Sequence, residues 1–141
     1  MKPQEVIELE KVLGFELQEV NSLEDIMDYD TYLAYFLNDK KQIAGLNLYD
    51  LELKETPFLQ GLTNLTHLNL YHNKINDISF LQGLINLTHL NLSDNQISDY
   101  SFLQNLLNLT RLDLYKNQIS DISFLQGLIN LTKRIYETVN K

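Results

Sequence analysis

The 141-residue sequence contains no cysteine, which excludes a disulfide framework and any metal site built from thiolates. No apolar run approaches the length of a membrane-spanning helix. The first residues are acidic where a secretory signal peptide has an apolar core, so we expect a cytoplasmic protein. The five glycines form no phosphate-binding loop.

Positive charge is also scarce, because 11 lysines and arginines face 19 acidic residues and leave a net charge of −8. Residues 1–42 hold most of this imbalance, with ten acidic groups against four lysines. Such a segment repels phosphate backbones and anionic membranes, so we predict neither a nucleic-acid partner nor a membrane partner. Solubility explains an acidic bias in many proteins, and a basic partner is the alternative.

The sequence does contain a repeat with a period of 22 residues, in which Asn-Leu-Thr opens each copy and a leucine-rich run follows. Three full copies and one truncated copy begin at Asn64, Asn86, Asn108 and Asn130. The linking segments repeat a Phe-Leu-Gln motif, which begins at Phe58, Phe80, Phe102 and Phe124. A unit this short cannot bury its apolar face alone, so the copies are expected to stack into a solenoid.

The pattern Leu-X-X-Leu-X-Leu-X-X-Asn-X-Ile, which begins at Leu65, resembles the leucine-rich repeat, specifically the 22-residue subclass of bacterial internalins. The resemblance covers residues 43–132, with one degenerate, three full and one truncated copy. It implies an α/β repeat solenoid: an arc with a parallel sheet on the concave side and 3₁₀ or short helical turns on the convex side. It also implies protein binding rather than catalysis, with no cofactor.

Residues 1–42 are expected to form an acidic, mainly helical cap that shields the first repeat from water. Apolar residues at helical spacing predict a helix over residues 4–13, which Gly14 ends. Ser22 is expected to be the N-cap of a second, short helix over residues 23–29.

Residues 32–37 and 42–48 predict a β-hairpin whose second strand is in register with the repeats. A helical start at Asp30 competes with the first of these strands. At the other end, apolar residues with i, i+4 spacing predict that residues 133–141 form a helical C-terminal cap.

Two sets of repeated side chains are expected to be structural. An asparagine follows each predicted strand where the chain turns, and its carboxamide can satisfy buried backbone groups as a ladder of Asn73, Asn95 and Asn117. The four phenylalanines of the linking segments form an apolar column expected to seal the convex turns. Alternatively, this column or the solenoid ends support a homo-oligomer.

Four columns of residues are predicted to face out of the concave sheet, where the core does not use them. They are Gly45, His67, His89 and Arg111; Asn47, Asn69, Asn91 and Asp113; Tyr49, Tyr71, Ser93 and Tyr115; and Asp50, His72, Asp94 and Lys116. Aromatic, imidazole and charged groups together are typical of protein-recognition surfaces. The candidate partner-binding residues are Tyr49, His67, Asn69, Tyr71, His72, His89, Asn91, Asp94, Arg111, Asp113, Tyr115 and Lys116.

Other kinds of site have little support in these columns. His67 and His89 lie one repeat apart, but zinc takes three or four ligands and Arg111 is the next residue in that column, so no metal site is predicted. No nucleophile stands beside a base, so no catalytic residues are predicted.

The sequence therefore predicts a non-enzymatic module that binds a protein or peptide on its concave face. A face of roughly 400 Å² is half of what each partner buries in a standard interface, which favours a peptide or loop, or contact with the cap as well. The alternative is a regulatory or inhibitory subunit that blocks an enzyme or toxin with the concave face and the acidic cap. A scaffold that assembles with itself is the third possibility.

Overall fold

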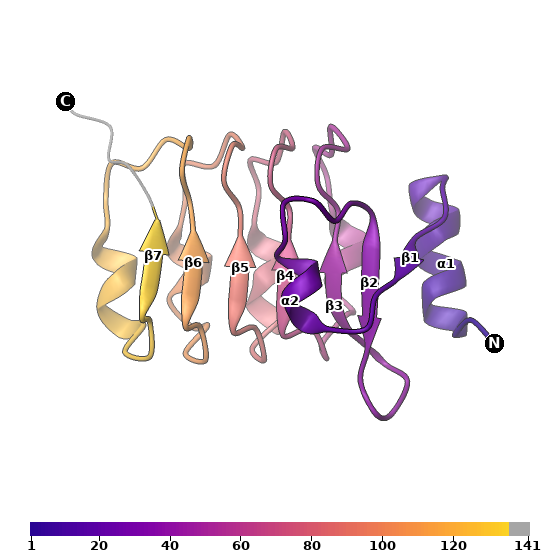
Figure 1. Ribbon diagram of the computed structural model, residues 1–141. Coiled ribbons are helices and arrows are strands. Elements are labelled where there is room, and N and C mark those ends of the chain that lie inside the picture. Colours follow the sequence, from indigo (N-terminus) through magenta and orange to yellow (C-terminus); the bar gives the residue numbers. More distant parts are fainter. Residues whose placement is uncertain (136–141) are drawn as a thin grey trace.

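The computed structural model describes residues 1–135 and shows one seven-stranded sheet whose strands follow the order of the chain (Figure 1). All strands from β3 onward are parallel, and residues 22 apart are paired in register. The strands are β1 (Gln18–Glu19), β2 (Ala34–Leu37), β3 (Ile43–Asn47), β4 (His67–Asn69), β5 (His89–Asn91), β6 (Arg111–Asp113) and β7 (Lys133–Ile135).

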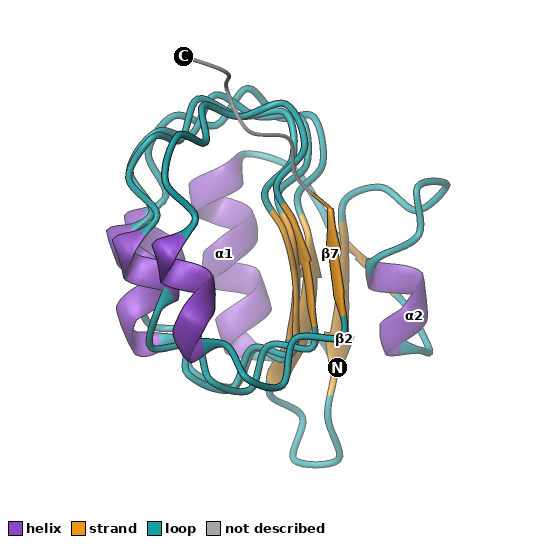
Figure 2. Ribbon diagram, turned by 90° about the vertical axis from the view of Figure 1, so that its left-hand side faces the viewer, coloured by secondary structure: helices purple, strands orange, loops and turns teal. Residues whose placement is uncertain are grey.

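Helices lie on both sides of this sheet (Figure 2). Helix α1 (Gln4–Leu13) shares one side with the 3₁₀ turns, which are η1 (Pro57–Leu59), η2 (Ser79–Gly83), η3 (Ser101–Leu103) and η4 (Ser123–Gly127). Helix α2 (Leu23–Ile26) lies alone on the opposite side, which we call the concave face. No helix within the described residues is long and apolar enough to cross a membrane.

The core lies between the sheet and the 3₁₀ turns and is continuous from rung to rung. Alternation along each strand buries the leucines of the repeat completely, as at Leu68, Leu70, Leu90 and Leu92. The isoleucines after each turn, such as Ile75 and Ile97, are equally buried. The predicted solenoid with a concave parallel sheet and convex 3₁₀ turns is confirmed.

The predicted first helix and its end at Gly14 are confirmed. Gly14 has a φ of 84°, a left-handed conformation that glycine adopts without steric cost, and it donates its amide to the Glu10 carbonyl. The apolar face of α1 joins the core through Val6 and Leu9. The Glu10 carboxylate then fixes the following chain by accepting from the Leu17 amide at 2.7 Å, and this bond is the main reason that its pKa is lowered.

The second predicted helix forms with Ser22 as its N-cap, whose hydroxyl accepts from the Asp25 amide at 3.3 Å. It ends at Ile26 rather than at residue 29. Its position differs from the expected end cap, because it packs across the concave face with Ile26 and Met27 buried beneath it. The cap therefore holds the first rungs from both sides of the sheet.

The hairpin predicted over residues 32–37 and 42–48 is confirmed, since β2 and β3 pair antiparallel. The competing helical start at Asp30 does not occur. A short strand that the sequence did not suggest, β1, adds to the outer edge of β2 in parallel.

The asparagine ladder is confirmed in each full repeat. The Asn95 amide donates to the carbonyls of Leu70 and Leu92 at 3.0 Å each, while its Oδ1 accepts from the Ile75 amide at 3.0 Å. Asn73 and Asn117 make equivalent bonds one rung to either side. Each ladder side chain thus joins two rungs through backbone groups that would otherwise be buried without partners.

Two further ladders explain the Asn-Leu-Thr motif. The threonine hydroxyl donates to the carbonyl 22 residues earlier, at 3.0 to 3.2 Å, from Thr66, Thr88, Thr110 and Thr132. The asparagine amide donates to the carbonyl 23 residues behind it, at 2.9 Å, from Asn86, Asn108 and Asn130.

The phenylalanine column seals the convex side, as predicted, but unevenly. Phe80 and Phe124 are buried, while Phe58 and Phe102 are partly buried and pack against the core. The ring that stacks on Phe124 belongs to Tyr100, at 5.3 Å between centroids. Self-association through this column stays a prediction.

The C-terminal prediction is wrong where the structure tests it. Residues 133–135 pair with β6 as the parallel strand β7 and do not begin a helix, because backbone groups at the open edge of β6 take a further strand. The rest of the predicted cap helix lies outside the described residues.

Replacing the central ladder residue, Asn95→Ala, should lower the free energy of unfolding by about 1 to 3 kcal/mol, because backbone groups of two rungs lose their partners. Chemical denaturation measures this loss. The exposed neighbour Gln96→Ala is the control and should stay within about 0.5 kcal/mol of the unsubstituted protein. Equal stability of the two variants would contradict the ladder.

Substituting Gly45 should disturb the seat of α2, because an added Cβ would lie 2.7 Å from Cγ1 of Ile26 and 3.1 Å from Cβ of Phe36. Gly45→Ala is expected to cost about 1 to 3 kcal/mol through overpacking. Combining it with Ile26→Ala removes the closest of these contacts, so the double variant should lose less stability than the sum of the two single losses. Additive losses in denaturant unfolding would show that α2 does not rest on Gly45.

Candidate functional site

The strand register aligns the residues of the first two predicted columns. Gly45, His67, His89 and Arg111 pair in succession, and Lys133 extends the column on β7. His67, His89 and Arg111 are each half-buried. The glycine at the start of the column is required by α2, whose Ile26 occupies the space where later rungs carry large side chains.

The second column is not available to a partner, which corrects the prediction for Asn69, Asn91 and Asp113. All three are only 2% exposed. Each asparagine folds back so that its Oδ1 accepts the amide two residues later, as from Tyr71 to Asn69 at 3.0 Å. Asn69 also lies within 3.5 Å of the Ile26 carbonyl, and its neighbour Asn47 donates to that carbonyl at 3.0 Å. These amides thus hold α2 in place.

A hollow of about 550 Å³ separates α2 from the free part of the sheet. Its lining residues are Leu23, Glu24, Met27 and Asp28 from the α2 segment, and His67, His89 and Arg111 from the sheet. One wall is acidic and the opposite side carries a guanidinium, with apolar and imidazole groups between them. The cap and the predicted concave residues therefore line one site.

The two histidines of the hollow are stacked, with ring centroids 4.1 Å apart and planes 12° from parallel. The Nδ1 atom of each contacts the preceding threonine hydroxyl, at 2.9 Å in His67 and 3.0 Å in His89. The hydroxyls of Thr66 and Thr88 each donate to a backbone carbonyl, as the hydroxyl of Thr110 does beside Arg111. A hydroxyl that already donates its proton can only accept from the imidazole, so each imidazole carries its proton on Nδ1 and leaves Nε2 as an acceptor.

Burial favours the neutral form of both imidazoles. Burial, and then the neighbouring His89, lowers the pKa of His67 from 6.5 to about 4. Burial and Arg111 lower the pKa of His89 as well. The stacked pair thus offers acceptor atoms and flat apolar surface rather than positive charge.

Arg111 is fixed by a carboxylate beneath it. Its Nε donates to Asp113 Oδ2 at 2.8 Å, while Oδ1 of Asp113 is buried and has no hydrogen-bond partner among the described residues. The reason is local: the Tyr115 amide, which would serve Oδ1, donates instead to the Ser93 hydroxyl at 3.1 Å. Arg111, which the sequence predicts to face out of the sheet, is thus held against the sheet by an ion pair with a buried carboxylate.

At the other end of the strands, four tyrosines form a continuous cluster. Tyr49 and Tyr71 of the third column stack at 5.1 Å, and Tyr32 and Tyr29 pack on them at 5.0 Å and 6.0 Å respectively. We call these four residues the tyrosine cluster. Tyr29 and Tyr32 were missed in the sequence, because they lie outside the repeats and only the path of the chain after α2 brings them to the sheet.

The fourth column forms the turn at the strand ends. Asp50, His72, Asp94 and Lys116 all have φ between 54° and 58°, a left-handed conformation in which Asp and His are more common than most residues. His72 bridges its neighbours, with Nδ1 2.6 Å from Asp94 Oδ2 and Nε2 3.6 Å from Asp50 Oδ1. The bond to Asp94 is the main cause of the raised pKa of His72.

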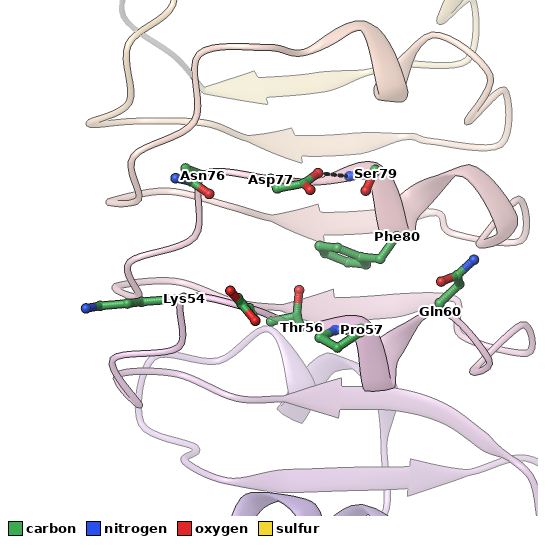
Figure 3. A pocket seen from close by; sticks show the side chains of 9 residues that line it. Lys54, Thr56, Pro57, Gln60, Asn76, Asp77, Ser79 and Phe80 are labelled. Carbon is green, nitrogen blue, oxygen red and sulfur yellow. Dashed lines mark hydrogen bonds between the residues drawn. The ribbon is translucent and has the colours of Figure 1, made fainter.

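A second hollow, of about 320 Å³, lies on the convex side between the first two 3₁₀ turns (Figure 3). Thr56 and Pro57 line it from one rung, and Asp77, Ser79 and Phe80 from the next. A similar hollow of about 190 Å³ recurs two rungs later. Because it follows the repeat, we attribute it to the spacing of the turns rather than to a ligand.

No group of three or more histidine or acidic side chains that could hold a metal occurs within residues 1–135. The convergent polar groups of the concave face are instead suited to hydrogen bonding and to aromatic contact.

The ion pair between Arg111 and Asp113 can be tested by its effect on stability. Arg111→Ala should lower the free energy of unfolding by about 1 to 3 kcal/mol, because it leaves the buried Asp113 carboxylate without its hydrogen-bond donor. Adding Asp113→Asn should restore most of that loss, since asparagine is uncharged and occupies the same place in three other rungs. If thermal melting shows Arg111→Ala to be neutral, the pair is not structural.

Comparison with known proteins agrees with this architecture. A family model described as leucine rich repeat matches residues 51–97, and one described as leucine rich repeats in two copies matches residues 85–127. No curated protein sequence matches the chain.

Several solved structures share the fold. An internalin (InlF) of Listeria monocytogenes is 36% identical, with a TM-score of 0.63 over 67% of this chain and 31% of that chain. Internalin C2 of the same organism is 31% identical, with a TM-score of 0.63 over 89% of this chain and 63% of that one. The structure of PEPR1–AtPEP1 is 27% identical, with a TM-score of 0.53 over 60% and 13%.

The chain thus spans less than two thirds of the length of either internalin. The stacked 22-residue rungs, the parallel sheet with its 3₁₀ turns and these matches together show that the chain belongs to the leucine-rich repeat family, with repeats of the internalin type.

Proposed function

We propose that this protein is a non-enzymatic module that binds a segment of a protein or peptide on its concave face, between α2 and the last strands. The observation that carries the proposal is the hollow of about 550 Å³, in which His67, His89 and Arg111 face the α2 segment. These large side chains contribute nothing to the leucine core. They resemble the mixture of aromatic and arginine anchors that dominates binding surfaces.

The size of the surface favours a narrow ligand. Helix α2 covers the concave side of the first rungs, so the free face is smaller than the roughly 400 Å² expected for five uncovered rungs. A stable interface between folded domains needs about 800 Å² from each partner. An extended peptide or loop laid between α2 and Tyr115 suits the remaining area.

One further observation supports the alternative of a regulatory or inhibitory subunit. Glu24 and Asp28 of the acidic cap line the same hollow as Arg111, so a ligand in it contacts the cap and the sheet together.

The PEPR1–AtPEP1 structure is one of a similar protein together with AtPEP1, which supports a peptide as the ligand class. The cytoplasmic location and the homo-oligomer stay predictions from the sequence.

The test is selection of binding peptides from a random phage-displayed library on the immobilised protein, followed by titration of the best peptides. His89→Ala and Tyr115→Ala should each weaken binding by about 1 to 3 kcal/mol, because both remove large side chains of the concave face. Leu107→Ala is the control, since Leu107 is 52% exposed on a loop outside that face. Peptides that bind all three variants equally would overturn the proposal.

A further inference from the structure

The tyrosine cluster indicates what kind of ligand the concave face takes, and this step rests on the proposed function. Two of its rings lie open to solvent: Tyr29 is 59% exposed and Tyr32 is 53% exposed. Large aromatic side chains at this exposure are uncommon on surfaces that bind nothing, whereas tyrosine is enriched at interfaces. The cluster is therefore a candidate contact surface for a ligand.

The charges around the cluster are mainly negative. Asp28 and Asp30 flank Tyr29 in the chain, and Asp50 and Asp94 lie near Tyr49, whose pKa is raised by burial and, to a lesser extent, by neighbouring groups that include both carboxylates. Electron-rich ring faces beside carboxylates attract cations and disfavour anions.

The nearby basic side chains already have partners within the protein. His72, which lies 6.0 Å from Tyr71 and 6.3 Å from Tyr49 between ring centroids, is bound between Asp50 and Asp94. Lys116 places its Nζ over the ring of Tyr115, 5.8 Å from the centroid.

The contact between Lys116 and Tyr115 shows that a tyrosine of the third column can hold a cation over its ring. Tyr115 belongs to the same column as Tyr49 and Tyr71, and in its rung the chain itself supplies a lysine to the ring. At the corresponding place beside Tyr49 and Tyr71, the chain has Asp50 and His72 instead of a lysine. The cluster thus presents rings of the same column without a lysine of its own.

We propose that the tyrosine cluster binds a cationic side chain, a guanidinium or an ammonium group, of the ligand segment. The partner of the concave face is accordingly a basic peptide or loop. Its arginine or lysine packs on the rings of Tyr29, Tyr32, Tyr49 and Tyr71, and the acidic residues Asp28 and Asp30 that flank Tyr29 in the chain add opposite charge.

The probe is the peptide acetyl-Gly-Arg-Gly-Arg-Gly-amide, titrated into the isotope-labelled full chain by NMR. The matched controls replace arginine by citrulline, which has the same shape without the charge, or by glutamate. The arginine peptide should shift the amide signals of Tyr29, Tyr32 and Tyr71 and bind about tenfold more tightly than the citrulline peptide. Its affinity should fall on addition of salt, as expected for an exposed charge contact.

Three substitutions distinguish loss of an aromatic ring from loss of folding. Tyr71→Phe keeps the ring and should bind the arginine peptide within about twofold of the unsubstituted protein, while Tyr71→Leu should lose about tenfold. Tyr32→Leu, at an exposed position, should lose binding without loss of stability. Equal affinity for arginine and citrulline peptides, or no shift at these residues with about 10 mM arginine peptide, would overturn the inference.

The outcomes also distinguish this inference from the proposed function. If library peptides depend on His89 and Tyr115 but carry no arginine or lysine, the concave face binds ligands and the cationic preference is wrong. If the arginine peptide shifts the cluster while no library peptide depends on His89 or Tyr115, the cluster is a cation site and the proposed ligand surface is wrong.

Discussion

The structure depends on one constraint: a 22-residue rung buries backbone carbonyls and amides at its turns, and only the adjacent rung can satisfy them. Asn95 meets this need from the turn after β5, Thr88 from the loop before β5, and Asn108 from the loop before β6. Each of these side chains bonds backbone of its neighbouring rung. The rungs therefore stack in a single register, and that register arranges the concave columns.

The same constraint explains why the face is only partly free. The second column, which the alternation of the strand turns outward, is folded back onto the backbone, and two of its amides anchor α2. Binding surface is thus left in the first, third and fourth columns. It is divided into a hollow of histidines and arginine at one end of the strands and the tyrosine cluster at the other.

The N-terminal cap has two physical roles in this arrangement. Helix α1 covers the apolar end of the core, as a solenoid end requires, while α2 and the chain after it reshape the binding face. Both parts are acidic, yet their carboxylates act differently. The Glu10 carboxylate accepts hydrogen bonds from the Leu17 amide and from Lys2, whereas Glu24 and Asp28 line the hollow.

The sequence by itself determined the period, the register, the strands β2 to β6, the Asn73, Asn95 and Asn117 ladder and the first two helices, because each follows from local spacing and from what a short repeat must bury. It also indicated which columns face outward. Only the tertiary structure decided that α2 crosses the sheet onto Gly45, that Asn69, Asn91 and Asp113 are buried, and that Tyr29 and Tyr32 join Tyr49 and Tyr71. These features depend on where a chain without repeats returns to the sheet, and no periodic pattern encodes such a long-range contact.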